Sequence, residues 1–131
     1  MKKLVVISII TLVVLGLSIV ESIFTYHTYN SIMQDATQLQ ILLKDKKENI
    51  NNDEQVLDLV EKVKDEWDRY SIIAYACTNH AIVKSVNEKI VSLEGFVMAD
   101  AVADAYVTAC VIGDVAFDMR KENLPTLGNL L

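Results

Sequence analysis

The 131 residues include 12 basic and 18 acidic side chains, and only two of the basic ones precede the long apolar run near the N-terminus. The rest of the chain therefore has a net charge of −8, which argues against nucleic acid or anionic lipid as a partner because both bind basic patches. Four glycines and one proline leave few breaks for a fold of many short strands. The composition therefore predicts an all-α fold.

The first element in the chain is a membrane-inserting segment. Leu4–Val20 contains no charged residue, and Leu4–Phe24 is 21 residues long if Glu21 reaches the far surface. At 1.5 Å per residue this helix measures roughly 31 Å, which matches the hydrocarbon core of a bilayer. Residues 1–24 are therefore predicted to form a transmembrane anchor that contacts the lipid bilayer through residues 4–24.

Flanking charges predict the orientation of the anchor. Lys2 and Lys3 lie on its N-terminal side, so the amino terminus is expected in the cytoplasm and residues 25–131 outside it, as a single-pass protein of the cell membrane. Tyr26 and Tyr29 would then lie at the outer interface. A cleaved signal peptide is the alternative, but its best small-x-small site, Gly16-Leu17-Ser18, lies inside the apolar run, so an uncleaved anchor is favoured.

Helical periodicity continues beyond the anchor. Apolar residues at helical spacing predict that the membrane helix extends outward as a stalk over about 25–47: Ile32, Ala36, Leu39 and Leu43. Asn49–Asn52 is the clearest loop, with Asn52 expected to cap the next helix and Gln55 in the capping-box position. A helix over about 53–78 follows, and its apolar stripe comprises Val56, Leu59, Val60, Val63, Trp67, Tyr70, Ala74 and Cys77.

A break is predicted at Thr78–His80. The stripe up to Cys77 and the next stripe, which comprises Ile82, Val86, Ile90, Leu93 and Val97, differ in direction by roughly 130° around a helical wheel. One straight helix cannot bury both stripes, so a kink or break is expected, with Asn79 as a candidate cap. The third helix is predicted over about 80–95, ending near Gly95.

The fourth helix is predicted over about 99–121, before a C-terminal tail that starts near Leu124-Pro125. Its many alanines make it thin, which allows neighbouring helices to approach closely. Four aspartates would lie within about 80° of one another on this helix: Asp100, Asp104, Asp114 and Asp118. A solvated face is the favoured interpretation, while a weak cation site and a docking surface for a basic partner are the alternatives. The expected architecture is a stalk followed by a small antiparallel bundle of about three further helices.

Few side chains suggest a functional site. Trp67 lies within the apolar stripe, so core packing is expected, although it could line a groove. His80 is expected to be a structural histidine at the break, with an ion pair to Asp100 or Asp104 as the alternative. Asn129 could dock the tail onto the bundle or belong to a partner-binding peptide.

The remaining patterns argue against an enzyme. No nucleophile elbow, zinc-protease, P-loop or dinucleotide fingerprint is found, and His27 is the only other histidine, so no catalytic residue, metal site or cofactor is expected. Cys77 and Cys110 are expected to be buried thiols, with a disulfide as the alternative. Two functions remain open: an interaction or structural module of the cell envelope, with a protein partner or itself, and a domain that senses a small molecule or cation.

Three features together resemble a family of small bacterial proteins. They are the lysine-flanked anchor before a short helical region, Trp67 followed thirteen residues later by His80, and the ending Leu127-Gly128-Asn129-Leu130-Leu131. The chain is similar over nearly its whole length to single-anchor proteins, common in clostridia, that are catalogued as a domain of unknown function, number 4363. The resemblance implies a membrane-anchored location and a helical architecture, and the family has no assigned activity.

Overall fold

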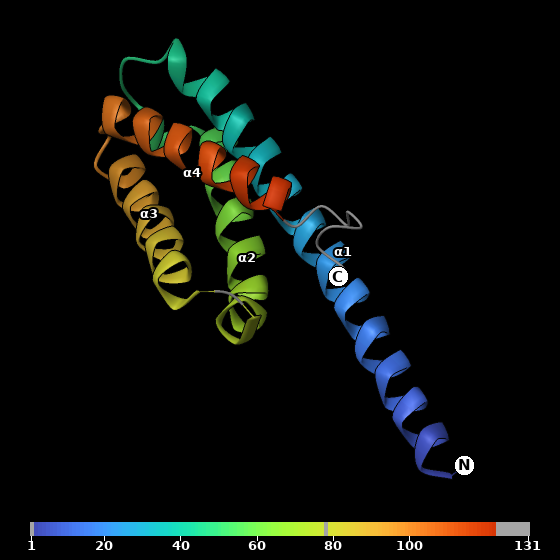
Figure 1. Ribbon diagram of the computed structural model, residues 1–131. Helices are drawn as coiled ribbons and strands as arrows, with labels where there is room; N and C mark the ends of the chain where they lie inside the picture. The colour runs from blue at the N-terminus through green and yellow to red at the C-terminus, as the bar shows by residue number, and fades with distance from the viewer. Residues whose placement is uncertain (1, 78, 123–131) are drawn as a thin grey trace.

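A computed structural model describes residues 2–77 and 79–122, and within these residues the chain is all-α (Figure 1). Its helices are α1 (Lys2–Lys44), the short 3-10 helix η1 (Ile50–Asn52), α2 (Glu54–Cys77), α3 (His80–Met98) and α4 (Val102–Glu122). The all-α fold with a long N-terminal helix followed by a bundle is confirmed. Asn129 and the rest of the predicted C-terminal tail lie outside the described residues.

Helix α1 has two parts with different surroundings. Its N-terminal part extends alone from the bundle (Figure 1), and every residue from Leu4 to Val20 is exposed. Within the described residues, α1 is the one helix that is long and apolar enough to cross a membrane. Its C-terminal part buries one face, from Tyr29 to Leu43, against α2 and α4. The segment over about 25–47, predicted as a stalk before the bundle, is therefore itself packed in the bundle.

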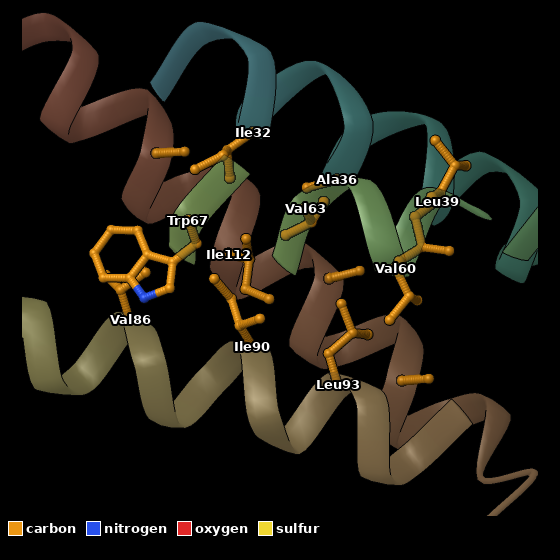
Figure 2. Close-up of a cluster of buried hydrophobic side chains, with 14 of the residues drawn as sticks. Ile32, Ala36, Leu39, Val60, Val63, Trp67, Val86, Ile90, Leu93 and Ile112 are labelled. Carbon is orange, nitrogen blue, oxygen red and sulfur yellow. The ribbon is translucent and has the colours of Figure 1, made fainter. Parts of the chain in front are cut away.

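Helix α2 supplies the centre of the core, as its apolar stripe predicts. All described side chains of that stripe, from Val56 to Ala74, are buried. Trp67 is completely buried, and Figure 2 shows its indole among side chains from several helices, with Ile32 of α1 and Val86 of α3 nearby. Trp67 is a core residue and does not line a groove.

The break between α2 and α3 is confirmed. Helix α2 ends at Cys77 and α3 begins at His80, where the Asn79 side-chain oxygen accepts a hydrogen bond from the Ala81 N–H at 2.9 Å. An N-cap of this kind satisfies an amide that the helix itself leaves unpaired. Two details differ from expectation: Val83 is buried where Ile82 was expected, and α3 continues past Gly95 to Met98.

The start of α2 is capped by a different residue from the expected one. Asp53, and not Asn52, accepts the N–H groups of Gln55 and Val56, at 3.0 and 3.2 Å from its Oδ1. Asn52 instead ends the 3-10 turn η1, whose first residue, Ile50, is completely buried. With Ile50 buried, residues 50–52 form this turn, and the N-cap of α2 is Asp53 in place of the predicted Asn52.

Helix α4 starts later than predicted, and this removes Asp100 from the helix. Asp100 has a φ of 56° and lies in the turn before Val102. The other three aspartates, at 104, 114 and 118, are exposed on α4, as expected for a solvated face. The small residues do allow close approach, because a Cβ added at Gly113 would lie 2.9 Å from Gln40 Nε2 of α1. The Gln40 amide also donates to the Ala109 carbonyl at 3.2 Å.

Candidate functional site

Polar and aromatic side chains gather at the two ends of the bundle. The proximal end is the end from which the apolar part of α1 leaves, and it contains Tyr29, Tyr70 and the turn between α2 and α3. The distal end contains the α1–α2 loop and the turn between α3 and α4. In Figure 1 the proximal end points towards the N-terminus of the chain and the distal end lies opposite.

The predicted site residues are not brought together. His80 is the first residue of α3 and is exposed, with its ring edge-on to Tyr75 at 5.7 Å between centroids. Asp100 follows the other end of the same helix, and 20 residues at 1.5 Å each separate them by about 30 Å. The alternative of an ion pair between His80 and Asp100 or Asp104 is therefore wrong, because Asp104 also lies near the distal end, in the first turn of α4.

A buried aromatic cluster joins α1 to α2 at the proximal end. The Tyr70 hydroxyl donates to Thr25 Oγ1 at 3.2 Å, and the rings of Tyr29 and Tyr70 meet edge-on at 5.3 Å. Trp67 lies beside Tyr70 at 6.0 Å between ring centroids. None of these four side chains is more than 3% exposed, and the indole N–H of Trp67 has no hydrogen-bond partner within the described residues. Ring packing, more than hydrogen bonding, holds this junction.

Sequence reasoning missed part of this cluster. Tyr29 was expected at the outer interface of the membrane, but its side chain faces the bundle interior and is 1% exposed. The signal was present: Thr25, Tyr29 and Ile32 continue the helical spacing of Ala36, Leu39 and Leu43 towards the N-terminus. The buried stripe of α1 therefore begins close to the end of the apolar run.

A carboxylate clasp fixes the distal end. The Asp100 side chain accepts the backbone N–H of Asn49 at 2.9 Å and that of Ile50 at 2.8 Å, which ties the α3–α4 turn to the α1–α2 loop. In the same loop Lys46 donates to the Asp53 carboxylate. This hydrogen bond, together with the one from the Val56 N–H, lowers the pKa of Asp53. Both aspartates satisfy backbone groups, so their role is structural.

A hollow also lies at the distal end. It has a volume of about 610 Å³, between the end of α1 and the start of α4. Its lining residues are Leu43, Lys44, Lys46, Lys47, Ala101, Val102, Ala103, Asp104 and Tyr106. Because Lys46 is paired with Asp53, Lys44 and Lys47 remain against Asp104, and this excess of positive charge favours a negatively charged ligand over a cation.

Metal and thiol chemistry have little support in the described residues. Within residues 2–77 and 79–122 no three His, Cys, Asp or Glu side chains are grouped to hold a metal ion. Cys110 is a free, half-buried thiol on α4, and its hydrogen bond with Tyr106 raises the pKa of that phenol. The free thiol was the favoured expectation for Cys110, and the side chain of Cys77 lies outside the described residues.

Comparisons with protein-family models, with curated proteins and with solved structures gave no match. The resemblance to the single-anchor bacterial family therefore stays a prediction.

Proposed function

We propose that this chain is a membrane-tethered protein of the bacterial cell envelope, whose helical domain stands outside the cytoplasm and serves as an interaction or structural module. The observation that carries the proposal is the double character of α1. One unbroken helix has an N-terminal part with every residue from Leu4 to Val20 exposed, and a C-terminal part that forms the core of the bundle. A water-soluble protein rarely exposes so large an apolar surface.

The orientation rests on charge. Lys2 and Lys3 precede the apolar part of α1, while the domain that follows has a net negative charge. Positively charged flanks stay on the cytoplasmic side of a membrane, which supports a bundle on the outer side.

The polar side chains of the domain favour a structural module over an enzyme. Asp53 and Asp100 accept backbone amides, and Glu66 accepts the Ser31 hydroxyl between α1 and α2. Asp53 thereby caps α2, while Asp100 and Glu66 each hold two distant segments of the chain together. A catalytic centre needs convergent acid, base and nucleophile groups in one cleft, whereas His80 and Asp100 lie at opposite ends of α3.

Exposed apolar residues give the domain surfaces for a protein partner or a second copy. Ile41, Val91 and Val107 are each more than half exposed, on three different helices. Single exposed apolar residues are common on protein surfaces, so these positions indicate where to place cross-linkers and do not by themselves identify a partner.

The test is photo-cross-linking in intact cells from positions 41, 91 and 107, followed by purification from solubilised membranes and mass spectrometry. We expect one envelope protein, or the chain itself, to be captured at one of these positions. The matched control carries residues 1–24 fused to an unrelated soluble domain, which removes partners that bind the anchor alone. Failure to capture any protein through the domain, or recovery of the chain in the soluble fraction, would contradict the proposal.

A second candidate function, small-ligand sensing, is favoured by the distal hollow. Its lysines would attract a small anion such as phosphate or a carboxylate. The expected result is a rise in melting temperature with added anion that is lost in the Lys44→Ala/Lys47→Ala double variant. Lys89→Ala on α3 is the matched control, since it removes a charge away from the hollow. Equal shifts in all three proteins would reflect general salt effects.

A further inference from the structure

The turn between α2 and α3 lies in the longest stretch without charged side chains outside the anchor. Tyr70–Val83 is a run of 14 residues without Asp, Glu, Lys or Arg. The first charged residue on each side is basic, Arg69 before the run and Lys84 after it. An uncharged apolar segment between basic residues is typical of contact with a membrane interface.

Among the residues that the structure describes, this segment has an apolar surface that the rest of the bundle leaves exposed. We use the name α2–α3 tip for residues 71–76 and 79–83. Four large apolar side chains of the tip are exposed: Ile72 at 77%, Tyr75 at 45%, Ile73 at 38% and Ile82 at 36%. The ring of His80 lies against Tyr75, so the exposed imidazole belongs to the same surface.

The tip reaches the level of the apolar part of α1. Helices α1 and α2 run antiparallel, since Lys46 meets Asp53 at one end and Thr25 meets Tyr70 at the other. Beyond Tyr70, α2 continues for seven residues to Cys77, which is about 10 Å at 1.5 Å per residue. In Figure 1 this extension and the N-terminal part of α1 point to the same end of the bundle, and the two helices diverge from one another. The tip therefore stands at the level of α1 residues on the N-terminal side of Thr25.

We propose that the α2–α3 tip is a second membrane contact, which inserts its apolar side chains into the outer boundary of the bilayer beside α1. The inference rests on the proposed function, because it requires α1 to span the membrane. If the span ends near Phe24, the space beside α1 at the level of the tip is filled by lipid. The tip's isoleucines then enter the acyl region, at a depth of about 5–10 Å typical of interfacial segments.

The polar groups of the tip suit this position. Tyr75 carries an apolar ring with a hydroxyl at its end, the type of side chain that membrane interfaces favour. Arg69 and Lys84 border the uncharged run and can extend their cationic groups to lipid phosphates. The driving contact is apolar, so the net negative charge of the domain does not oppose it over zwitterionic lipid.

Tryptophan reporters quenched by lipid test this contact in the full chain. Tyr75→Trp is made in a Trp67→Phe background, and the protein is reconstituted into phosphatidylcholine vesicles with or without bromine on the acyl chains. Leu12→Trp reports on the span. Met98→Trp is the matched control, because Met98 is also an exposed apolar residue but ends α3 at the distal end.

We expect roughly twofold quenching at positions 12 and 75, since both rings would lie at acyl-chain depth, and no quenching at position 98. Quenching at 12 with none at 75 would overturn the tip contact and leave the anchor standing. Blue-shifted, unquenched emission at 75 would also overturn it, by assigning the surface to a second copy of the chain. Equal quenching at 75 and 98 would also overturn a contact confined to the tip, because the whole domain would then lie on the membrane.

The reporters also distinguish a failure of the membrane span from an effect of the Trp67→Phe background. No quenching at position 12 would show that α1 is outside the bilayer, which overturns the proposed function and the tip contact with it. Because Trp67→Phe alters the core, the same three reporters are also measured with Trp67 intact, as differences from the unsubstituted chain. If the tip contacts lipid, the additional fluorescence of Tyr75→Trp should also be quenched when Trp67 is intact. No quenching at position 75 in either background would contradict the proposal.

Discussion

The two ends of the bundle are held by different forces. At the distal end, Asp53 and Asp100 accept backbone amides, and Asp100 joins segments about 50 residues apart. At the proximal end, rings from α1 and α2 pack in the interior, and the α2–α3 tip leaves isoleucines exposed. Hydrogen bonds from backbone amides to carboxylates suit an end of the bundle that faces water. Packed aromatic rings suit an end that is shielded from water. Hydrogen bonds to carboxylates therefore stabilise the distal end, and aromatic packing stabilises the proximal end.

Among the substitutions that compare the two ends, Trp67→Ala at the proximal end should have the largest effect on stability. The side chain is completely buried among side chains from several helices, so its loss leaves a large cavity near the proximal end. We expect the free energy of unfolding to fall by ~3–5 kcal/mol. Denaturation of the full chain in detergent, followed by circular dichroism at 222 nm, measures the change. Ile72→Ala is the control, and it should change the free energy of unfolding by less than about 0.5 kcal/mol because Ile72 is exposed. Equal changes in the two variants would contradict the assignment of Trp67 to the core.

Asp100 tests the distal end. Its carboxylate accepts two N–H groups, and its φ of 56° lies in the left-handed region, where Asp is tolerated better than Ala. Asp100→Ala removes the acceptor and adds strain, so we expect a loss of about 2–3 kcal/mol in unfolding free energy. The same denaturation measurement applies.

A substitution series at position 100 separates the two causes. Asp100→Gly removes the carboxylate without left-handed strain, and Asp100→Asn keeps one acceptor oxygen, so the losses should decrease in the order Ala, Gly, Asn. Asp114→Ala, on the exposed face of α4, is the matched control and should be close to neutral. If Asp100→Ala is equally neutral, the clasp adds no stability.

Asp53 makes the distal end sensitive to acid. Because the hydrogen bond from Lys46 lowers its pKa in the folded state, its stabilising effect is complete above the unfolded pKa of about 3.9. The effect is lost as the pH falls through the lower, folded pKa. The difference in unfolding free energy between the native chain and Asp53→Asn should therefore shrink as the pH drops below about 4. At neutral pH Asp53→Ala should cost about 1 kcal/mol as a lost cap. A difference independent of pH would contradict the ion pair.

The smallest effect concerns two glycines between the ends. Gly95 on α3 has open space where a Cβ would be placed, so Gly95→Ala should stabilise the chain by about 0.5–1 kcal/mol through helix propensity. At Gly113 a Cβ would displace the Gln40 amide from its bond to the Ala109 carbonyl, which cancels that gain. The melting temperature of Gly95→Ala should therefore be higher than that of Gly113→Ala. An equal gain at both positions would mean that α1 and α4 are packed less closely than described.

Helix-level features could be predicted from the sequence because they depend on local spacing. The stripe of α2 and the break before His80 both follow from where apolar residues fall around a helical wheel. The choice between Ile82 and Val83 could not be made this way, because both are apolar and adjacent. The packing of α3 against its neighbours decides it, and Val83 continues the spacing of Val86 and Ile90.

The distal end could not be predicted because it depends on contacts between distant segments. From the sequence alone, Asp100 is one of four aspartates on a predicted helix, and its role depends on the Asn49 and Ile50 amides, which are about 50 residues away. Asn52 has the right side chain for a cap, but burial of Ile50 moves the cap to Asp53. The inner position of the supposed stalk likewise requires knowing which helices surround it.

The unbroken course of α1 has a mechanical consequence. The 21 residues from Phe24 to Lys44 form a rigid arm of about 30 Å beyond the proposed span. Spanning helices tilt when the bilayer becomes thinner, and a tilt of about 10° would swing the far end of this arm sideways by about 5 Å. With the domain built around the arm, changes in membrane thickness would be converted into displacement of the whole distal surface.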